Sequence, residues 1–536
     1  MFIGNDARTT MLMGINKVAD FVAATMGPGG KAINIKLANN NHITKDGVTV
    51  AKHFVVADPA EQVGVDFIYE AANKTVTEAG DGTTTTTVMA REMMLQGHQR
   101  LALKKLNTNR VAKRMVHYSD IAIKHIKAQS RQVSIDTEEG QKLLLDVGTI
   151  SANGDTQMAK MCLEAIKLVG PEPNSITYTR ADFDEKDTFV FKSGMHIPSR
   201  VGGELLGPFN RRSIRGINDD GMVAVLIIPS TEMELSLTNI FRGFMDQLSK
   251  KGHGILVVCK EPASNLKGYL VADSERFQTA FVSPNLHGNR YVQLCEDLTI
   301  LTGAVAIDEA ETRNTETPRI LLGYCKSVDI SPDGLTVIDP VRKGSPEHEM
   351  LITKVQEMIP QETNAHAREQ LKDRLARITN GVVAVRVTPT ADSNVYERID
   401  RYDDCVRAMI TSLKTGVVRG GGVAYLSAAY QLLNEQVDPL DQEDKIARDL
   451  IEAALVTPFN TITMNAMNYI PKIDGKRLVN ETTLTIDVWS GDFINAEENG
   501  ILDPLGVQVT SIHSAVQATA VFLNTGGMYA GRNSLV

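Results

Sequence analysis

The chain has 536 residues, more than one hydrophobic core can organise, so we expect roughly three or four domains. Hydrophobic residues make up 43% and charged residues 23%, the balance of an ordinary water-soluble globular protein. The net charge of −9 argues against a general nucleic-acid partner, and no apolar stretch is long enough to cross a bilayer.

Five cysteines are scattered singly, without a CxxC pair. An odd number at these spacings favours free buried thiols in a reducing compartment over disulfides. The first residues reach an acid at Asp6 without a basic segment followed by an apolar one, so we expect no signal peptide. The expected location is the cytoplasm, or the host cytoplasm if a virus encodes the chain.

The first part of the chain has helical periodicity. Apolar residues recur every three or four positions from Met11 to Met26, which predicts one face of a helix that the glycine-rich stretch 27–30 ends. Alternation at Ile33 and Ile35 predicts a short strand, and residues 42–50 resemble a turn that leads into a second strand. Further helices are predicted over residues 63–79, 84–103 and 109–128.

The middle of the chain has a different pattern. Apolar runs of strand length cover residues 223–228, 255–259, 279–282 and 319–324, and helical patterns such as 237–250 and 292–302 alternate with them. After a strand over 382–387, helices return over 401–415, 423–433, 445–467 and 507–523. We therefore expect a multidomain α and α/β fold, in which both chain ends form a mainly helical domain and an α/β domain is inserted between them.

One glycine-rich turn carries chemistry. Gly80, Asp81 and Gly82 stand between two helical patterns and are followed by five threonines. Glycines allow a close approach of the backbone, and the start of a helix favours an anion such as phosphate. Asp81 would oppose a phosphate unless a cation lay between them, which points to Mg²⁺. A solvated capping turn explains the same residues equally well at this point.

Other turns are weaker signals when taken alone. Residues 25–30 fit a helix end better than a phosphate site, residues 44–47 fit a hairpin, and residues 420–422 fit a close packing point between helices. The chain has no GxxxxGK[ST] phosphate loop and no dinucleotide GxGxxG after a strand. His348 and Glu349 do not form an HExxH metal motif, because residue 352 is isoleucine.

Several of these segments occur together and in one order. They are TMGPGG (25–30), ITKDGVTVAK (43–52), AGDGTTTTTV (79–88), VGTISANGD (147–155), VVRGGGVA (417–424) and GILDP (500–504). In this combination the chain resembles a group I chaperonin, the bacterial GroEL-like type. The resemblance covers essentially the whole chain; it is strong at both ends and weak in the middle.

The resemblance implies a chaperonin fold with three domains. Residues 1–131 and 416–536 would form a mainly helical equatorial ATPase domain. Residues 132–191 and 382–415 would form a small intermediate hinge domain, and residues 192–381 an α/β apical domain that binds substrate. The implied partners are further copies in a homo-oligomeric ring, seven-fold by resemblance, and non-native polypeptides.

The resemblance also implies the roles of individual residues. The catalytic residues would be Asp46 and Asp404, which orient the attacking water, and Asp81 would hold Mg²⁺. Thr25 and Lys45 would hold K⁺ through their backbones. The nucleotide, ATP, would contact Gly27, Pro28, Gly82, Thr83, Thr84, Thr85, Gly421, Asp487 and Asp503, with Asp503 at the ribose and Asp487 on the adenine side.

The apical part departs from the family pattern. The segment after Met195 is longer and lacks the family's paired aromatics, which puts a requirement for a co-chaperonin lid in doubt. The apical part also has apolar residues at helical spacing. Such residues usually belong to a hydrophobic core, but they could also form a surface that binds unfolded chains. The candidate substrate-binding residues are Leu205, Phe209, Phe241, Phe244, Met245, Leu266, Leu270 and Val271.

Two further departures concern assembly. The repeated Gly-Gly-Met tail is missing, and Asn460 and Tyr469 stand where the family has a charge pair between rings, so a single-ring state is a hypothesis.

Two other functions remain open. One is a structural or binding ring with little ATPase activity, against which Asp46, Asp81 and Asp404 argue. The other is an unrelated ATP-dependent enzyme, for which the middle of the chain offers no recognisable chemistry.

Overall fold

The computed structural model describes residues 2–36, 41–104, 106–171, 175–180, 186–200, 213–215, 221–227, 250, 253–259, 279–284, 286, 288–305, 322–331, 334–379, 381–390, 395–437, 440–466 and 474–529. The chain divides into two compact units. The first unit combines Met1–Glu164 with Pro389–Val536, and the second is Ala165–Thr388.

The first unit is mainly helical. Its helices are α1 (Asn5–Ala23), α2 (Gly47–Lys52), α3 (Pro59–Ala79), α4 (Thr83–Lys104), α5 (Thr108–Ala128), α6 (Glu138–Ser151), α14 (Val395–Thr415), α15 (Val423–Leu432), α16 (Gln442–Asn465), α17 (Gly475–Asn480) and α18 (Leu505–Leu523). The boundary between the units falls within α7 (Thr156–Val169). A large cluster of buried apolar side chains from α1, α3, α4, α5, α15, α16 and α18 forms the core of the first unit.

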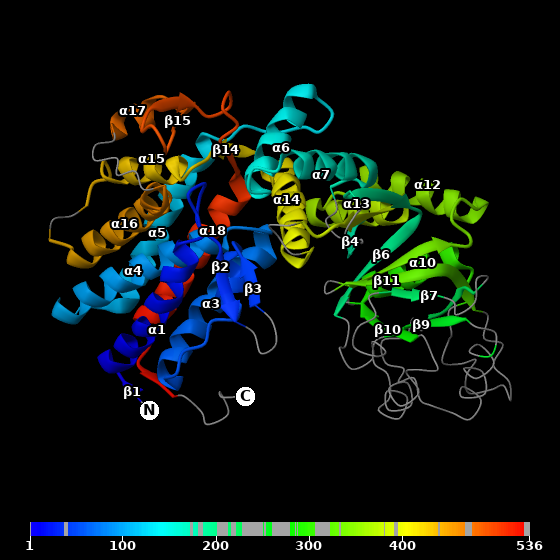
Figure 1. Cartoon of the computed structure of the whole chain (residues 1–536), viewed down its shortest axis with the longest axis horizontal. Helices are drawn as coiled ribbons and strands as arrows, with labels where there is room; N and C mark the ends of the chain where they lie inside the picture. The colour runs from blue at the N-terminus through cyan, green and yellow to red at the C-terminus, as the bar shows by residue number, and fades with distance from the viewer. Residues whose placement is uncertain are drawn as a thin grey trace. The chain divides into compact units, whose positions relative to one another are not determined.

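Short antiparallel pairs of strands join distant segments of this unit. They are β1 (Phe2–Ile3) with β18 (Gly527–Met528), β2 (Ile33–Lys36) with β3 (Asn41–Thr44), β14 (Val417–Arg419) with β17 (Leu502–Pro504), and β15 (Leu484–Ile486) with β16 (Phe493–Asn495). The β1–β18 pair holds the two ends of the chain together, and Arg8 strengthens it by donating to the carbonyl oxygen of Thr525 at 2.8 Å. The first unit is therefore closed by its own termini (Figure 1).

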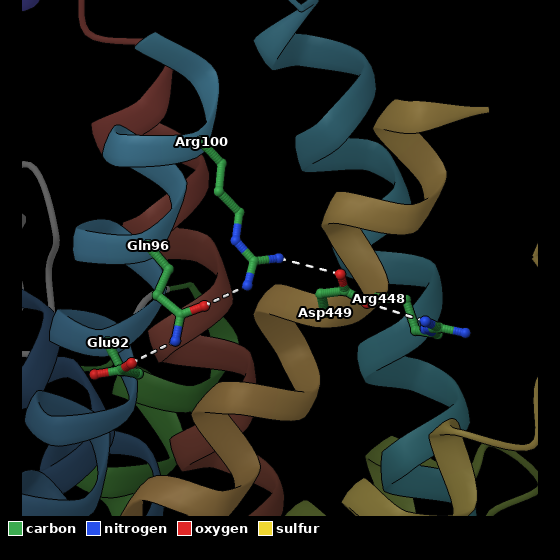
Figure 2. A network of polar contacts seen from close by, with 5 residues as sticks. All are labelled: Glu92, Gln96, Arg100, Arg448 and Asp449. Atoms are coloured by element: carbon green, nitrogen blue, oxygen red, sulfur yellow. Dashed lines mark hydrogen bonds and ion pairs between the residues drawn. The ribbon is translucent and has the colours of Figure 1, made fainter. Parts of the chain in front are cut away.

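A polar network links helices α4 and α16 on the side of this bundle. Arg100 donates to Gln96 at 2.8 Å and to Asp449 at 3.1 Å, and Gln96 donates to Glu92. Figure 2 shows these contacts. Arg448 donates to the other oxygen of Asp449 at 3.0 Å. These side chains are only partly buried, so each ion pair contributes at most about 1 kcal/mol, and the apolar core carries most of the packing energy.

The second unit is an α/β body. Its elements are β4 (Ile176–Arg180), β5 (Thr188–Lys192), β6 (Gly194–Arg200), β7 (Ser213–Arg215), β8 (Val223–Ile227), β9 (Gly254–Val258), β10 (Thr279–Pro284), α10 (Asn289–Thr302), β11 (Gly323–Ser331), β12 (Gly334–Pro340), α12 (Pro346–Gln361), α13 (Ala365–Thr379) and β13 (Val382–Val387). Seven strands pair in the order β12-β6-β10-β9-β8-β11-β7, and β12 also pairs with β11. Strands β4, β13 and β5 form a separate sheet.

The core of the second unit lies between the seven-stranded sheet and helix α10. Strands β8 and β9 are buried along their whole length, as expected for parallel strands covered on both faces. A buried ion pair, Arg374 to Asp297 at 2.7 Å, joins α13 to α10. His348, in the first turn of α12, donates from Nε2 to the carbonyl oxygen of Ile378 at 2.8 Å and accepts at Nδ1 from the N–H of Gly344, so its ring has a packing role.

Most predicted elements of the first unit are confirmed, with one correction. Residues 42–50 do not lead into a second strand through a hairpin turn at 44–47, because a short helix, α2, follows strand β3 directly. The reason is Asp46, whose carboxylate accepts from the backbone N–H groups of Val48 and Thr49 and so caps a helix. In the second unit, the strand predicted over 319–324 is β11, which begins only at Gly323 among the described residues.

One expectation from composition also agrees with the structure. All five cysteines are buried and free of disulfides. Within the described ranges, no helix is both long and apolar enough to span a membrane.

Candidate functional site

The turn between α3 and α4 is the centre of the candidate site. Gly80 ends α3 in the left-handed conformation at φ 80°, and Gly82 follows at φ 97°. The carboxylate of Asp81 accepts from the N–H of Gly82 at 2.5 Å. Only glycine takes these angles without strain, so the sequence forces the chain to reverse here and to begin α4 with its free N–H groups at the turn.

Helix α18 presses against this turn from the C-terminal part of the chain. A Cβ atom at Gly82 would lie 2.6 Å from the Oγ of Ser511 and 2.8 Å from the Cγ1 of Val507. Ser511 also donates to the carbonyl oxygen of Gly82 at 3.4 Å. Any larger residue at position 82 would push α18 away, so the glycine serves close packing as well as backbone geometry.

The second carboxylate comes from the start of α2. Asp46 uses both oxygens as a helix cap, with Oδ1 accepting from Val48 N at 3.1 Å and Oδ2 from Thr49 N at 2.9 Å. The next residue, Gly47, packs directly on α4, because a Cβ atom there would lie 2.3 Å from the Oγ1 of Thr84. The α2 start therefore lies against the first turn of α4, beside Asp81.

Helix α14 brings the third carboxylate. The hydroxyl of Thr411 donates to the carbonyl oxygen of Ala79 at 3.0 Å. A Cβ atom at Gly80 would lie 2.6 Å from the Cβ of Arg407, so α14 lies directly on the glycine turn. Arg407 is held along its own helix by Asp403 at 2.7 Å. Asp404, on the same helix, faces the other carboxylates closely enough to feel their charge.

These negative charges shift one another's proton affinity. Burial, followed by the charges of Asp81 and Asp46, raises the pKa of Asp404 well above its usual range. Burial also raises the pKa of Asp81, the N–H of Gly82 opposes this, and the charge of Asp46 adds to it. A group of carboxylates that destabilise each other's charged form is a site that a cation would stabilise.

A fourth carboxylate, Asp400, belongs to the same group but was not predicted. Burial of its carboxyl group, followed by the charges of Asp46 and Asp403, raises its pKa to about 7, although the residue as a whole remains exposed. It lies one helical turn before Asp404 on α14. Sequence spacing alone would have found it, since residues four apart lie on one face of a helix.

The triple glycine and Asp503 meet across the β14–β17 pair. Gly421 and Gly422 both have positive φ, at 70° and 77°. A Cβ atom at Gly420 would lie 3.0 Å from the Oδ1 of Asp503, and one at Gly421 would meet nothing closer than 3.7 Å. Gly421 is thus less closely packed than Gly420 or Gly422, and its contact with a ligand stays a prediction.

The segment beyond this turn is fixed by a buried arginine. Arg419 is 3% exposed, and its guanidinium donates to the carbonyl oxygens of Leu478, Glu481 and Leu484 at 2.6–3.0 Å. It also donates to the side chain of Gln129. The cation binds carbonyl groups near the end of α17 and at the start of β15, so the glycine turn and the segment towards Asp487 are held as one piece.

Asp487 makes its hydrogen bonds to residues that follow it closely in the sequence. Its carboxylate accepts from the N–H of Trp489 at 2.9 Å and from the hydroxyl of Ser490 at 3.2 Å. Its backbone N–H donates to the carbonyl oxygen of Asp492, so the residue shapes the β15–β16 turn. A role on the adenine side stays a prediction.

The remaining predicted residues follow the end of α1 or precede the start of α2. Gly27 has φ 77° and contacts Ile462, and both Gly27 and Pro28 are exposed. Thr25 is buried and donates to the carbonyl oxygen of Val22 at 2.8 Å. Lys45 immediately precedes the Asp46 cap. Their predicted contacts with nucleotide and K⁺ stay predictions.

The threonines differ in their surroundings. Thr83 is 5% exposed, and its carbonyl oxygen accepts from the hydroxyl of Thr87 inside α4. Thr86 shares a hydrogen bond with Thr75 at 2.9 Å, so it is part of the α3–α4 contact. Thr84 and Thr85 are half-buried at the first turn of the helix, where backbone N–H groups and hydroxyls can face an anion.

The site as a whole combines the free N–H groups at the start of α4, which suit a phosphate chain, with carboxylates that suit a cation. In the part of the chain that the structure describes, no three His, Cys, Asp or Glu side chains converge to hold a metal ion by themselves. Mg²⁺ is commonly held by one or two carboxylates together with phosphate oxygens, and Asp81 beside the α4 start suits that arrangement.

Several predicted residues lie outside the described residues. These are the candidate substrate-binding side chains Leu205, Phe209, Phe241, Phe244, Met245, Leu266, Leu270 and Val271, together with Tyr469. Asn460 is described and is an exposed residue of α16. The sequence analysis missed three buried polar residues near the site, Tyr425, Gln508 and Ser511, although polar residues three apart on the apolar helix α18 are a usable signal.

Comparisons with known proteins agree with this architecture. A sequence model of the TCP-1/cpn60 chaperonin family matches residues 18–194 and 247–528. The fold is similar to that of the chaperonin gp146 from the bacteriophage EL 2 (Pseudomonas aeruginosa), crystallised in the presence of ATP-BeFx. Crystal form II gives a TM-score of 0.70 and crystal form I 0.64, each at 20% identity over 98% of both chains. The likeness confirms the predicted multidomain α and α/β fold.

Proposed function

Because this chain belongs to the TCP-1/cpn60 chaperonin family, we propose that it is an ATP-dependent chaperonin subunit. It would assemble into a ring, enclose non-native proteins and couple ATP hydrolysis to their folding. The observation that carries the proposal is the convergence of Asp46, Asp81 and Asp404 at the glycine turn that begins α4. These residues come from three separate segments, and burial, together with their mutual repulsion, raises the pKa values of Asp81 and Asp404.

Mg²⁺ bound together with a phosphate chain would offset this repulsion between the carboxylates. Bound Mg²⁺ would neutralise phosphate charge and polarise the terminal phosphoryl group. Asp81 would contribute a carboxylate oxygen to the ion, while the N–H groups at the start of α4, with Thr84 and Thr85, would contact phosphate oxygens. K⁺ would be held by the backbone carbonyl groups of Thr25 and Lys45, since a carbonyl oxygen is a suitable ligand for a hard cation.

Asp404 and Asp46 would act on the attacking water. Asp404 is not used as a helix cap, and its raised pKa suits a carboxylate that accepts a proton as the water attacks. Asp46 is fixed by its cap bonds to Val48 and Thr49, so it would orient the water rather than move. Asp503 would accept a ribose hydroxyl, and Gly421 would leave room for the nucleotide.

Ring assembly and the other predicted partners extend this proposal. The first unit exposes Ile3, Ile43 and Val55 by 67%, 56% and 77%, apolar surface that a neighbouring copy would cover. Seven-fold symmetry, a single-ring state and the binding of non-native chains by the second unit are part of the proposal, as is a cytoplasmic location. A separate lid protein is not required by it.

A phosphate-release assay with and without an unfolded protein tests the function. We expect Mg²⁺-dependent phosphate release together with a higher yield of refolded client in the presence of ATP. Ring particles without phosphate release would favour a structural or binding ring. Phosphate release without any ring or client effect would favour an unrelated ATP-dependent enzyme.

A further inference from the structure

The two carboxylate oxygens of Asp503 have different neighbours, Gly420 at one and Gln508 at the other. Its Oδ1 faces the Cα of Gly420, where an added Cβ would lie 3.0 Å away. Its Oδ2 accepts from the side-chain amide Nε2 of Gln508 at 3.0 Å. An ionised carboxylate only accepts hydrogen bonds, so the amide nitrogen of Gln508 must face it.

Gln508 is itself buried at the centre of the first unit. It is 1% exposed, and its Oε1 is shielded from solvent and has no hydrogen-bond partner among the described residues. Its backbone carbonyl oxygen accepts from the hydroxyl of Tyr425 at 3.2 Å. A buried amide whose oxygen is unpaired lowers stability relative to an apolar side chain of similar size. Such a residue has a reason to be there other than packing.

We propose that Gln508 is a positioning residue for Asp503: its amide group holds the carboxylate ionised and oriented so that Oδ1, the oxygen beside Gly420, can accept a ribose hydroxyl. The inference rests on the proposed nucleotide function and adds a residue that acts through another. Burial raises the pKa of Asp503 to about 6, the Gln508 hydrogen bond lowers it, and the charge of Asp81 raises it. Gln508 therefore keeps the carboxylate charged near neutral pH.

Other groups around Asp503 define what a pH experiment will see. Tyr425 from α15 and Asp81 from the α3–α4 turn both interact electrostatically with it. Helix α6, which packs against β17, contributes Asp146 beside Gly500, and burial raises the pKa of Asp146. Helix α14, also packed on β17, contributes the uncharged Thr411 and Thr415 near Gly506.

Two substitutions separate positioning from packing. Gln508→Met keeps the length of the side chain and removes the donor, so the pKa of Asp503 should rise. Gln508→Glu keeps the shape and places an acid against Asp503, and this acid donates only when it is protonated. The two variants should therefore respond to pH in opposite directions.

The experiment is titration calorimetry of the full chain with ADP and, separately, with inorganic triphosphate, both with Mg²⁺, from pH 6 to pH 8. For Gln508→Met we expect ADP affinity to fall about tenfold at pH 7, the loss of one hydrogen bond to a charged group. The ratio of wild-type to variant affinity should grow towards pH 6 and shrink towards pH 8. For Gln508→Glu the same ratio should shrink towards pH 6. Triphosphate affinity should be unchanged, and the thermal unfolding midpoint of Gln508→Met should not fall.

The contrary results are distinct. If the wild-type chain binds ADP and Gln508→Met binds it equally well at every pH, the role of Gln508 is wrong and the proposed function stands. Equal losses of ADP and triphosphate affinity would also overturn the inference, because they would indicate a general disturbance of the fold. If the wild-type chain binds neither ligand, the proposed function itself is wrong.

Discussion

The hydroxyl of Thr411 donates to the carbonyl oxygen of Ala79 at 3.0 Å, across 332 positions of the sequence. This bond joins helix α14 to the last turn of α3, immediately before the glycine turn. Because Asp404 lies on α14 and Asp81 follows Ala79 by two residues, the bond helps to set the separation of the two carboxylates. The proposed chemistry depends on that separation.

Thr411→Val tests this contact. Valine keeps the shape of the side chain and removes the hydrogen bond, which is worth about 1 kcal/mol. If all of that energy orients Asp404, the turnover number for ATP should fall about fivefold, while ATP affinity stays within a factor of about two. Steady-state phosphate release and equilibrium nucleotide binding measure the two quantities.

The matched control is Ser412→Ala, one position further along α14. Ser412 is buried, and its hydroxyl donates within the helix to the carbonyl oxygen of Ala408 at 2.9 Å. Its removal should leave turnover nearly unchanged. Equal effects of the two substitutions would show that the Thr411–Ala79 bond has no special part in positioning Asp404.

The cluster formed by the carboxylates of Asp46, Asp81, Asp400 and Asp404 predicts an unusual pH dependence of the stability of the chain without nucleotide. The pKa of Asp400 is raised from 3.8 to about 7, so the folded chain holds a proton that the unfolded chain releases above about pH 4. The stabilisation is present at low pH and is lost as the pH rises through 7. The thermal unfolding midpoint should therefore respond to pH less steeply between pH 5.5 and 7.5 in Asp400→Asn than in the wild-type chain.

Asp403→Asn serves as the comparison for this experiment, because it removes one of the charges that raise the pKa of Asp400 but leaves the Asp400 carboxyl in place. Its pH response should resemble that of the wild-type chain more than that of Asp400→Asn. Saturating Mg²⁺ and ADP should reduce the difference between wild type and Asp400→Asn. If the unfolding midpoint of Asp400→Asn changed with pH in parallel with that of the wild-type chain, the raised pKa of Asp400 would be contradicted.

Gly82→Ala tests the close approach of α18 to the glycine turn. The φ of 97° disfavours alanine by roughly 1 kcal/mol, and the contacts of 2.6 Å and 2.8 Å with Ser511 and Val507 add a further cost of about 1–3 kcal/mol. We expect a lower free energy of unfolding, measured by denaturant titration, and weakened nucleotide binding.

Gly154→Ala provides the comparison. Gly154 has a similar φ of 89°, but a Cβ atom there would meet nothing within 4 Å. Its substitution should therefore carry only the backbone cost. Similar losses for both glycines would mean that the contact with α18 contributes little to the site.

The helices and strands of this fold could be predicted from the sequence better than the tertiary contacts between them. Periodic apolar residues located most helices of the first unit, and strand β13 was predicted with its observed bounds. The α2 helix was mistaken for a strand because a single capping residue, Asp46, decides it. No local pattern could show that α14 lies on the turn at Gly80, since that contact depends on side chains more than 300 residues apart.

The candidate site was recognised through a family resemblance rather than through residue spacing. The glycine turn at 80–82 remained open between a cap and an anion site until its other segments were considered together. Gln508 was missed because its place on the apolar helix α18 marks it as unusual but does not identify its partner, Asp503, which only the structure shows. Arg419 was missed for the same reason: its partners are carbonyl groups, which leave no trace in the sequence.

The most direct test of the central claim is the ATPase activity of Asp404→Ala, compared with Asp403→Ala and the wild-type chain. Steady-state phosphate release and nucleotide affinity are measured on the same preparations. Asp404→Ala should bind ATP with nearly wild-type affinity and lose most of its turnover, about a hundredfold if it acts as general base, while Asp403→Ala should keep most of its activity. Unchanged turnover in Asp404→Ala would contradict the account.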